Sequence, residues 1–289
     1  MKARRALVEE ALDRALPPED APPPTVHRAM RYSVLAGGKR LRPLLAIAGA
    51  EAVGGDAALV MPTACALELI HTYSLIHDDL PAMDDDDYRR GRLTNHKVFG
   101  EAIAILAGDA LLTLAFRLIA DNAALARDPR VVRDVVATVA DAAGTDGMVG
   151  GQVVDIESEG KTISAEMLDY IHTHKTASLI RASLVVGALL AGGRADAVAA
   201  IRGAGESLGL AFQIVDDILD VEGNLAELGK TAGSDERKKK VTYPSHHGLG
   251  ASRAKAQALI EDAQRALGPL GAGAGPIRAL AEFIHARRS

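Results

Sequence analysis

Two short acidic motifs carry the residues whose types and spacing could do chemistry. The first, in "IHDDLPAMDDDDYRRG" (76–91), places Asp78 and Asp84 six positions apart. The second, in "AFQIVDDILD" (211–220), places Asp216 and Asp220 four positions apart. Both follow an apolar run with helical spacing, so the chain is expected to contain two similar acidic half-sites.

The second motif predicts a site for a divalent cation. On a helix, Asp216 and Asp220 share a face, while the nearby Ile214, Val215, Ile218 and Leu219 are apolar. Like charges held together on an apolar helix repel each other, and a divalent cation would compensate them. The alternative is a solvated helix face with incidental acids, which the recurrence of the motif disfavours.

The first motif has a different geometry. Pro81 cannot donate a helical hydrogen bond, so it is expected to distort or end the helix and to let Asp84 return beside Asp78. The next acids, Asp85, Asp86 and Asp87, are either outer groups of the site or surface charge, and Asp86 and Asp87 are interpreted as surface charge. The sequence assigns no role to Asp79 or Asp217.

The ligand types favour magnesium. The motifs offer only carboxylate oxygens, with no cysteine pair and no histidine pair at zinc spacing, and they lack the Gly and Glu positions of a calcium-binding EF-hand loop. Mg²⁺ commonly takes one or two carboxylates and shares its other positions with water and a substrate phosphate. The motifs therefore predict a phosphorylated substrate.

Several basic residues lie next to a glycine pair or to an acidic motif, where they could bind the phosphate groups of a substrate. Lys39 and Arg42 follow a glycine pair in "GGKRLRP", and the glycines permit close approach of the backbone. Arg89 and Arg90 follow the first acidic motif. Lys175, Lys230 and Lys240 are further candidates. The stretch "GNLAELGKT" has five residues between its glycines and is rejected as a nucleotide-binding P-loop, which has four.

The elements that must position these residues are helices. Apolar residues recur at i, i+3, i+4 and i+7 in six stretches, aromatic residues make up only 3% of the chain, and no run alternates as a strand does. We expect one all-α domain spanning 1–289, a bundle of about ten helices around a central cavity. The segment "SLVVGALLAGG" is apolar nearly all round, as in a helix at the centre of a large bundle or at a subunit interface.

Charge and composition exclude some classes of protein. The net charge is −5, so no overall positive field attracts nucleic acid or an anionic membrane. The single cysteine, Cys65, is expected to be a buried core residue. The N-terminal segment lacks an apolar signal core and no 18-residue uncharged run follows, so a cytoplasmic protein with no stable membrane insertion is expected.

The combined motifs resemble those of the short-chain trans-prenyl diphosphate synthases, most closely the bacterial farnesyl diphosphate synthases. The resemblance spans residues 32–244, in the order found in that family. The blocks that carry it are "GGKRLRP", "IHTYSLIHDDLPAMDDDDYRRG", "FGEAIAILAGDALLTLAF", "GGQVVDIE", "IHTHKTASLIRAS", "GLAFQIVDDILD" and "LGKTAGSDERKKKVTYP".

The resemblance implies an isoprenoid synthase fold, a homodimer and a role for each candidate residue. Asp78 and Asp84 would bind two Mg²⁺ ions, and Asp216, helped by Asp220, a third. The departing pyrophosphate of an allylic substrate would be stabilised by Arg89, Lys175, Lys230 and Lys240. Isopentenyl diphosphate would be held by Lys39, Arg42, His71 and Arg90. Thr176 and Gln213 would stabilise the allylic carbocation as neutral dipoles.

The length of the product is argued from two residues before the first motif. Ser74 and Tyr73 lie about 6 and 7.5 Å before Asp78 along a helix. In the resembling family an aromatic residue here accompanies a C15 product and a smaller one a C20 product, so Tyr73 predicts farnesyl diphosphate. The alternatives are a geranylgeranyl diphosphate synthase, a class I terpene cyclase, a non-catalytic subunit of a heteromeric synthase and a magnesium-dependent diphosphatase.

Overall fold

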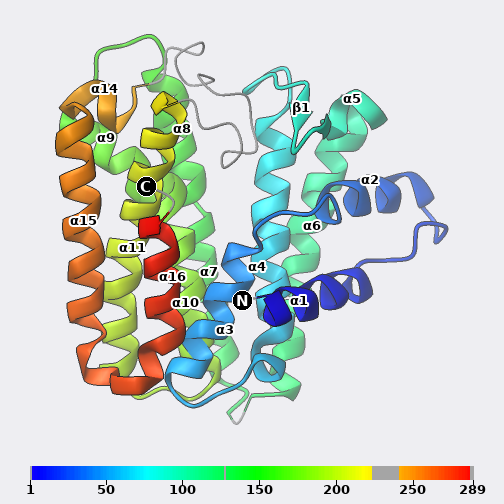
Figure 1. Cartoon of the computed structure of the whole chain (residues 1–289). Coiled ribbons are helices and arrows are strands. Elements are labelled where there is room, and N and C mark those ends of the chain that lie inside the picture. The colour runs from blue at the N-terminus through cyan, green and yellow to red at the C-terminus, as the bar shows by residue number, and fades with distance from the viewer. Residues whose placement is uncertain (1, 127, 223–240, 287–289) are drawn as a thin grey trace.

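The chain is built of long helices packed side by side, as the periodicity predicts (Figure 1). The computed structural model describes residues 2–126, 128–222 and 241–286. Its α-helices are α1 (Lys2–Ala15), α2 (Pro24–Val34), α3 (Leu41–Ala52), α4 (Ala57–Asp78), α5 (Asn95–Phe99), α6 (Glu101–Asp121), α7 (Val131–Ala143), α8 (Met148–Ser158), α9 (Ala165–Ile171), α10 (Ser178–Leu190), α11 (Ala195–Glu222), α14 (Tyr243–His247), α15 (Leu249–Ala266) and α16 (Gly275–Ala286). The expected all-α class is confirmed.

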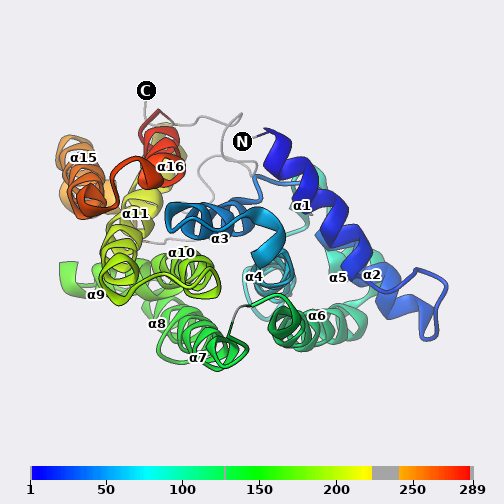
Figure 2. The ribbon, with the colours of Figure 1, turned by 90° about the horizontal axis from the view of Figure 1, so that it is seen from below.

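Helices α3 and α10 lie side by side in the middle of the bundle (Figure 2). Almost every residue of both helices is buried. A Cβ atom on Gly187 would lie 1.9 Å from the Ala46 carbonyl oxygen, and one on Gly49 would lie 2.0 Å from the Leu184 carbonyl oxygen. These glycines therefore allow the two backbones to touch. The expectation that "SLVVGALLAGG" is a central helix is confirmed.

The two helices that carry the acidic motifs flank this central pair. In sequence order both α4 and α11 run toward the upper end of the molecule in Figure 1, where their C-terminal ends lie. Helix α4 packs against α3, and α11 packs against α10. Because the acidic residues stand in the last turns of both helices, the fold brings the two motifs to the same end of the bundle.

In the described part of the chain, two helices are long and apolar enough for a membrane span by length and composition alone. In α4 67% of the tested segment is buried, as in the core helix of a bundle. The other, Glu101–Ala124, which includes α6, is only 33% buried. Leu106 on α6 is 54% exposed. Helix α6 thus presents an apolar face that the described part of this chain does not cover.

A small β-hairpin follows the first acidic motif and was not expected. Strand β1 (Tyr88–Arg89) pairs antiparallel with β2 (Arg92–Leu93). The turn residues Arg90 and Gly91 have φ values of 54° and 75°. Two successive positive φ values are typical of the tight turns that join hairpin strands. Two-residue strands rich in arginine leave no alternating pattern, which is why the sequence did not reveal them.

The segment "HTHKTA" forms a π-helical turn, η2 (His172–Ala177), between α9 and α10. A π-turn inserts extra backbone into a helix and is frequent at functional sites. It carries Lys175 and Thr176, two of the predicted site residues.

Candidate active site

The loop after α4 folds back on the end of that helix. Helix α4 ends at Asp78, three residues before Pro81. The backbone N–H of Asp84 donates to the Asp78 carbonyl oxygen at 2.7 Å. The predicted end of the helix and the return of Asp84 to Asp78 are therefore confirmed at the level of the backbone.

Helix α8 supports Asp78 and Lys175 from one side. Gln152 Nε2 donates to Asp78 Oδ1 at 3.0 Å, and Lys175 Nζ donates to Asp155 Oδ2 at 2.6 Å. A Cβ atom on Gly151 would lie 2.3 Å from the Lys175 backbone nitrogen, so only glycine lets α8 approach the π-turn this closely. The block "GGQVVDIE" thus contains two positioning residues, Gln152 and Asp155, that sequence reasoning did not assign. The signal that could have found them is the glycine pair followed by polar residues in this block.

Asp79 and Arg89 form a bidentate ion pair. Arg89 Nε and Nη2 donate to Asp79 Oδ1 at 2.8 and 2.7 Å, and Asp79 is only 3% exposed. Burial alone would lower the pKa of Arg89, but the hydrogen bonds and the charge of Asp79 outweigh it and raise that pKa. Asp79, which had no predicted role, therefore holds the Arg89 guanidinium in place and keeps it charged.

Three of the four residues predicted to hold a second diphosphate form a cationic cluster. Burial is the largest cause that lowers the pKa of Arg42 to about 10, and the neighbouring charge of Arg90 acts in the same direction. The pKa of His71 lies well below its usual range because of burial and then because of Arg42 and Arg90. We call Arg42, His71 and Arg90 the cationic cluster. Positive charge gathered in a buried place favours an anionic ligand.

The glycine pair makes room for this cluster. Arg90 Nη1 donates to the Gly37 carbonyl oxygen. A Cβ atom on Gly38 would lie 2.8 Å from Arg90 Cζ. The predicted close approach to the glycine pair is therefore confirmed, and the group that approaches is the Arg90 guanidinium. Lys39, the fourth predicted residue, follows directly in the same loop and its side chain is exposed.

Arg40 has a structural role. It is 1% exposed, and its guanidinium donates to Glu68 Oε1 and to both carboxylate oxygens of Glu9 at 2.9 Å. Its φ of 52° lies in the left-handed region. Among the described residues, the non-glycine residues with positive φ are Arg40, Asp85 and Arg90. All three stand in the two loops around the cationic cluster, and the Arg40 and Arg90 side chains are held there by the hydrogen bonds given above.

The second acidic motif is connected to the π-turn by a chain of hydrogen bonds. Thr176 Oγ1 donates to Gln213 Oε1 at 2.8 Å, and Gln213 Nε2 donates to Asp217 Oδ1 at 2.9 Å. Asp217 Oδ2 accepts from the Tyr243 backbone N–H at 2.8 Å and lies 3.3 Å from His172 Nε2. Asp217 therefore ties α11 to η2 and α14. The predicted pair of Thr176 and Gln213 is brought into contact.

The predicted metal ligands differ in exposure. Asp78, Asp84 and Asp216 are half-buried, whereas Asp220 is 4% exposed. The charge of Asp216 acts on Arg42, so the second motif and the cationic cluster share one electrostatic environment. Lys230 and Lys240 lie outside the described residues.

The remaining acids of the first motif make contacts at the surface. Asp86 Oδ2 lies 4.0 Å from Arg89 Nη2, and Asp87 Oδ1 lies 2.7 Å from Lys97 Nζ.

Cys65 is 2% exposed, and burial raises the pKa of its thiol to about 12. A thiol this basic is not a nucleophile at neutral pH, which agrees with the expected core residue.

The two residues from which the product length is argued, Tyr73 and Ser74, lie on the last turns of α4. Tyr73 is 7% exposed and meets the His77 ring edge-on, with 5.7 Å between ring centroids. The His77 ring lies on Gly108 of α6, where a Cβ atom would come within 2.1 Å of His77 Nε2. Ser74 Oγ donates to the His71 carbonyl oxygen at 2.9 Å. Tyr73 is thus a packed side chain with little freedom to move.

An all-α bundle with two acidic motifs at one end and a cationic cluster beside them is the arrangement expected of an enzyme that binds a metal ion and an anionic substrate. The sequence profile of the family described as Polyprenyl synthetase matches residues 23–267. The chain belongs to this family, whose members named below are prenyltransferases.

Relatives cover nearly the whole chain. The heterodimeric geranylgeranyl pyrophosphate synthase large subunit 1 of Arabidopsis thaliana is 51% identical over 98% of this chain and 77% of its own length. Two solved structures also match 98% of the chain. Geranylgeranyl pyrophosphate synthetase of Pyrococcus horikoshii has a TM-score of 0.88 at 32% identity over 96% of its chain. Geranyltransferase of Helicobacter pylori, complexed with magnesium and isoprenyl diphosphate, has a TM-score of 0.86 at 31% identity over 95% of its chain.

Proposed function

We propose that this prenyltransferase condenses isopentenyl diphosphate with an allylic diphosphate, head to tail. The observation that carries the proposal is the presence of two separate sets of cations at one end of the bundle. Lys175 pairs with Asp155 of α8, the helix whose Gln152 contacts Asp78, and the cationic cluster includes Arg90 of the hairpin turn. One diphosphate needs only one such set, so two sets support two diphosphate substrates.

The donor set of the acidic motifs fits magnesium. Carboxylate oxygens at half-buried positions suit a hard cation that shares its coordination with water and phosphate. The residues proposed to hold Mg²⁺ are Asp78, Asp84, Asp216 and Asp220. When bound, Mg²⁺ neutralises negative charge on the allylic diphosphate and so makes it a better leaving group. The magnesium in the H. pylori relative's complex supports this choice.

The chain's own residues position and stabilise the substrates. Gln152 orients the Asp78 carboxylate. Asp155 accepts one hydrogen bond from the Lys175 ammonium group, whose other N–H groups can donate to a departing diphosphate. We assign the same role to Lys230 and Lys240. Thr176 and Gln213 present neutral dipoles to the allylic cation, since neutral groups are not alkylated by it. Apolar helix faces exclude water.

Isopentenyl diphosphate is assigned to Lys39 and the cationic cluster. A neutral His71 can donate one hydrogen bond to a phosphate oxygen, while Arg42 and Arg90 supply the charge. Arg89, fixed by Asp79, stands next to Arg90 in the chain and is proposed to contact the allylic diphosphate. Adjacent arginines on one hairpin then serve two different substrates.

The product favoured by the relatives is geranylgeranyl diphosphate, with 20 carbons. The names of the Arabidopsis and Pyrococcus relatives support this length over the farnesyl product expected from Tyr73. Tyr73 is a packed aromatic residue about one and a half helical turns before Asp78 and favours 15 carbons. We therefore propose a C20 product, with C15 as the second candidate that Tyr73 supports.

One experiment tests both the reaction and the length. Purified protein is incubated with Mg²⁺, isopentenyl diphosphate and dimethylallyl diphosphate, and the dephosphorylated products are separated by chromatography. A linear prenol of defined length supports the proposal. A cyclic hydrocarbon indicates a terpene cyclase, C5 alcohols with phosphate release indicate a diphosphatase, and no turnover indicates a non-catalytic subunit; each contradicts the proposal.

Variants of the acidic motifs connect the activity with its residues. Asp78→Ala and Asp216→Ala each remove a proposed metal ligand, so turnover should fall by orders of magnitude. The helical circular dichroism should stay unchanged because each change also relieves repulsion between carboxylates. Loss of helicity together with activity would contradict a catalytic role for these residues.

A further inference from the structure

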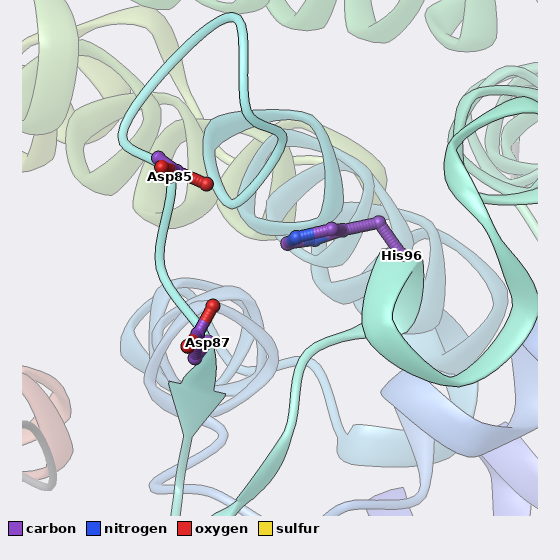
Figure 3. A group of neighbouring side chains, drawn as sticks. All are labelled: Asp85, Asp87 and His96. Carbon is purple, nitrogen blue, oxygen red and sulfur yellow. The ribbon is translucent and has the colours of Figure 1, made fainter.

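A second group of potential metal ligands lies outside the motif residues assigned to magnesium. Asp85, Asp87 and His96 each offer one ligand atom, and these atoms lie within 4.8 Å of one another. Figure 3 shows the two carboxylates on the segment before β1 and the His96 ring on α5 pointing toward a common space. We call these three residues the Asp–Asp–His group.

The His96 ring gives independent support for a ligand at this place. His96 is 6% exposed, and its Nε2 atom is buried with no hydrogen-bond partner in the described part of the chain. A buried polar atom without a partner is costly, so native proteins rarely leave one unsatisfied.

The hydrogen bonds on the other side of the ring fix its tautomer. Thr94 Oγ1 lies 3.4 Å from the Asp87 carbonyl oxygen and 3.2 Å from His96 Nδ1. A carbonyl oxygen can only accept, so the hydroxyl donates to it and accepts from Nδ1–H. The lone pair of His96 therefore resides on Nε2. This is the arrangement that orients a histidine ligand toward a metal ion.

We propose that the Asp–Asp–His group binds a divalent transition metal ion such as Mn²⁺ or Zn²⁺, with water at the remaining positions. An imidazole nitrogen combined with carboxylates suits such ions better than Mg²⁺, which prefers oxygen ligands. The ion would join the loop that contains Asp84 to the start of α5. Metal binding here does not depend on the proposed prenyl transfer.

Lys97 tunes the affinity of this site. Its Nζ lies 2.7 Å from Asp87 Oδ1 and competes with a cation for that carboxylate. The Lys97→Met variant should therefore bind Mn²⁺ about three- to tenfold more tightly, because one nearby positive charge is removed. Lys161→Met, which changes an exposed lysine elsewhere, should leave the Kd unchanged. A Kd that does not fall in Lys97→Met overturns the assignment of Asp87 as a ligand.

Pulsed electron paramagnetic resonance of the full chain with Mn²⁺, without substrate, tests the imidazole ligand directly. The wild type should show nitrogen-14 coupling from a bound imidazole, and His96→Gln should lose it. Asp78→Ala, which affects only the proposed magnesium site, should keep it. Asp87→Asn should weaken binding, as a second variant that leaves the buried ring in place.

The matched control is His246→Gln. His246 is exposed on α14, with its ring centroid 4.5 Å from that of His247, and this pair could also collect a metal ion. The nitrogen coupling should persist in His246→Gln. The proposal is overturned if the wild type shows no nitrogen coupling, if the coupling survives His96→Gln, or if it disappears in His246→Gln.

Discussion

Adjacent basic residues in this chain have distinct surroundings and therefore distinct roles. Arg40 is buried between Glu9 and Glu68 and supports the glycine loop. Arg89 is bound by Asp79, whereas Arg90 reaches back to the Gly37 carbonyl oxygen and joins Arg42 and His71. The proposed binding of two diphosphates depends on this separation, because two neighbouring arginines are directed to different partners.

At the residue scale, Tyr73 is expected to control product length. The Tyr73→Ala variant removes a packed ring from the last turns of α4 and should lengthen the product by at least one five-carbon unit. Chromatography of radiolabelled prenols from wild type and variant measures the change. The control, Ser74→Ala, replaces an already small side chain and should not alter the length. An unchanged product in Tyr73→Ala would show that Tyr73 is not the floor of the cavity.

His71 should make stability depend on pH. Its pKa in the folded protein lies below the value of about 6.5 in the unfolded chain, so the unfolded state binds the proton more readily. The stabilising contribution is present above pH 6.5 and is lost as the pH falls below it, by at most about 1.4 kcal/mol per pH unit. Urea unfolding between pH 5 and 8 measures this dependence.

The His71→Asn variant should show a smaller loss of stability below pH 6.5 than the wild type. Exposed His246 provides the matched control, since His246→Asn should keep the wild-type pH dependence. Equal pH dependence in wild type and His71→Asn would contradict the lowered pKa.

Asp79 should contribute to stability through its pair with Arg89. Asp79→Asn leaves a partly buried guanidinium without its carboxylate and should lower the free energy of unfolding by about 1–3 kcal/mol. Chemical denaturation measures the loss. Asp128→Asn, which breaks an exposed pair with Arg130, should change stability little. Similar losses in the two variants would argue against a special role for the Asp79 pair.

At the element scale, α8 and the π-turn η2 act as one support for the first acidic motif. Gln152 reaches Asp78 and Asp155 reaches Lys175, so a shift of α8 would displace a proposed metal ligand and a proposed substrate ligand together. The close contact between the two elements depends on Gly151. Rigid elements, not loops, therefore set the distance between these two groups.

Gly151→Ala should reduce turnover by about tenfold or more, because its new methyl group would push α8 away from the Lys175 backbone. Steady-state kinetics measure the effect on kcat and KM. In the control, Gly203→Ala, the new methyl group meets no atom within 4 Å, so activity should be kept and helix stability raised by about 0.5–1 kcal/mol. Normal turnover in Gly151→Ala would show that α8 tolerates the shift.

At the scale of the whole molecule, the uncovered apolar face of α6 supports a homodimer. Leu106 and Ile105 are 54% and 44% exposed on a helix whose composition is otherwise that of a core helix. We propose that a second copy of this chain covers this face. The Arabidopsis relative is named as a subunit of a heterodimer, so a different partner is the alternative.

The Leu106→Glu variant should be monomeric because it places a charge in the proposed interface. Size-exclusion chromatography with light scattering should give twice the chain mass for the wild type and the single mass for this variant. Leu7→Glu, which changes a similarly exposed leucine on α1, should remain dimeric. A monomeric wild type would contradict the homodimer.

Much of the fold and the candidate site was predictable because it depends on local sequence. Helical periodicity predicted the all-α bundle, and Pro81 predicted the end of α4. The types of residue in the acidic motifs and in the basic segments predicted the candidate ligands, because charged groups gathered on apolar helices need a counter-charge.

The sequence by itself determined the class of fold, the family and the identity of most candidate ligands, since each follows from residue types at short spacing. Only the tertiary structure decided which neighbours have which role. Asp79 and Asp217 are buried partners of Arg89 and of the Tyr243 backbone, while Gln152 and Asp155 act from α8. Contacts between residues far apart in the chain depend on helix packing, and no local pattern encodes them.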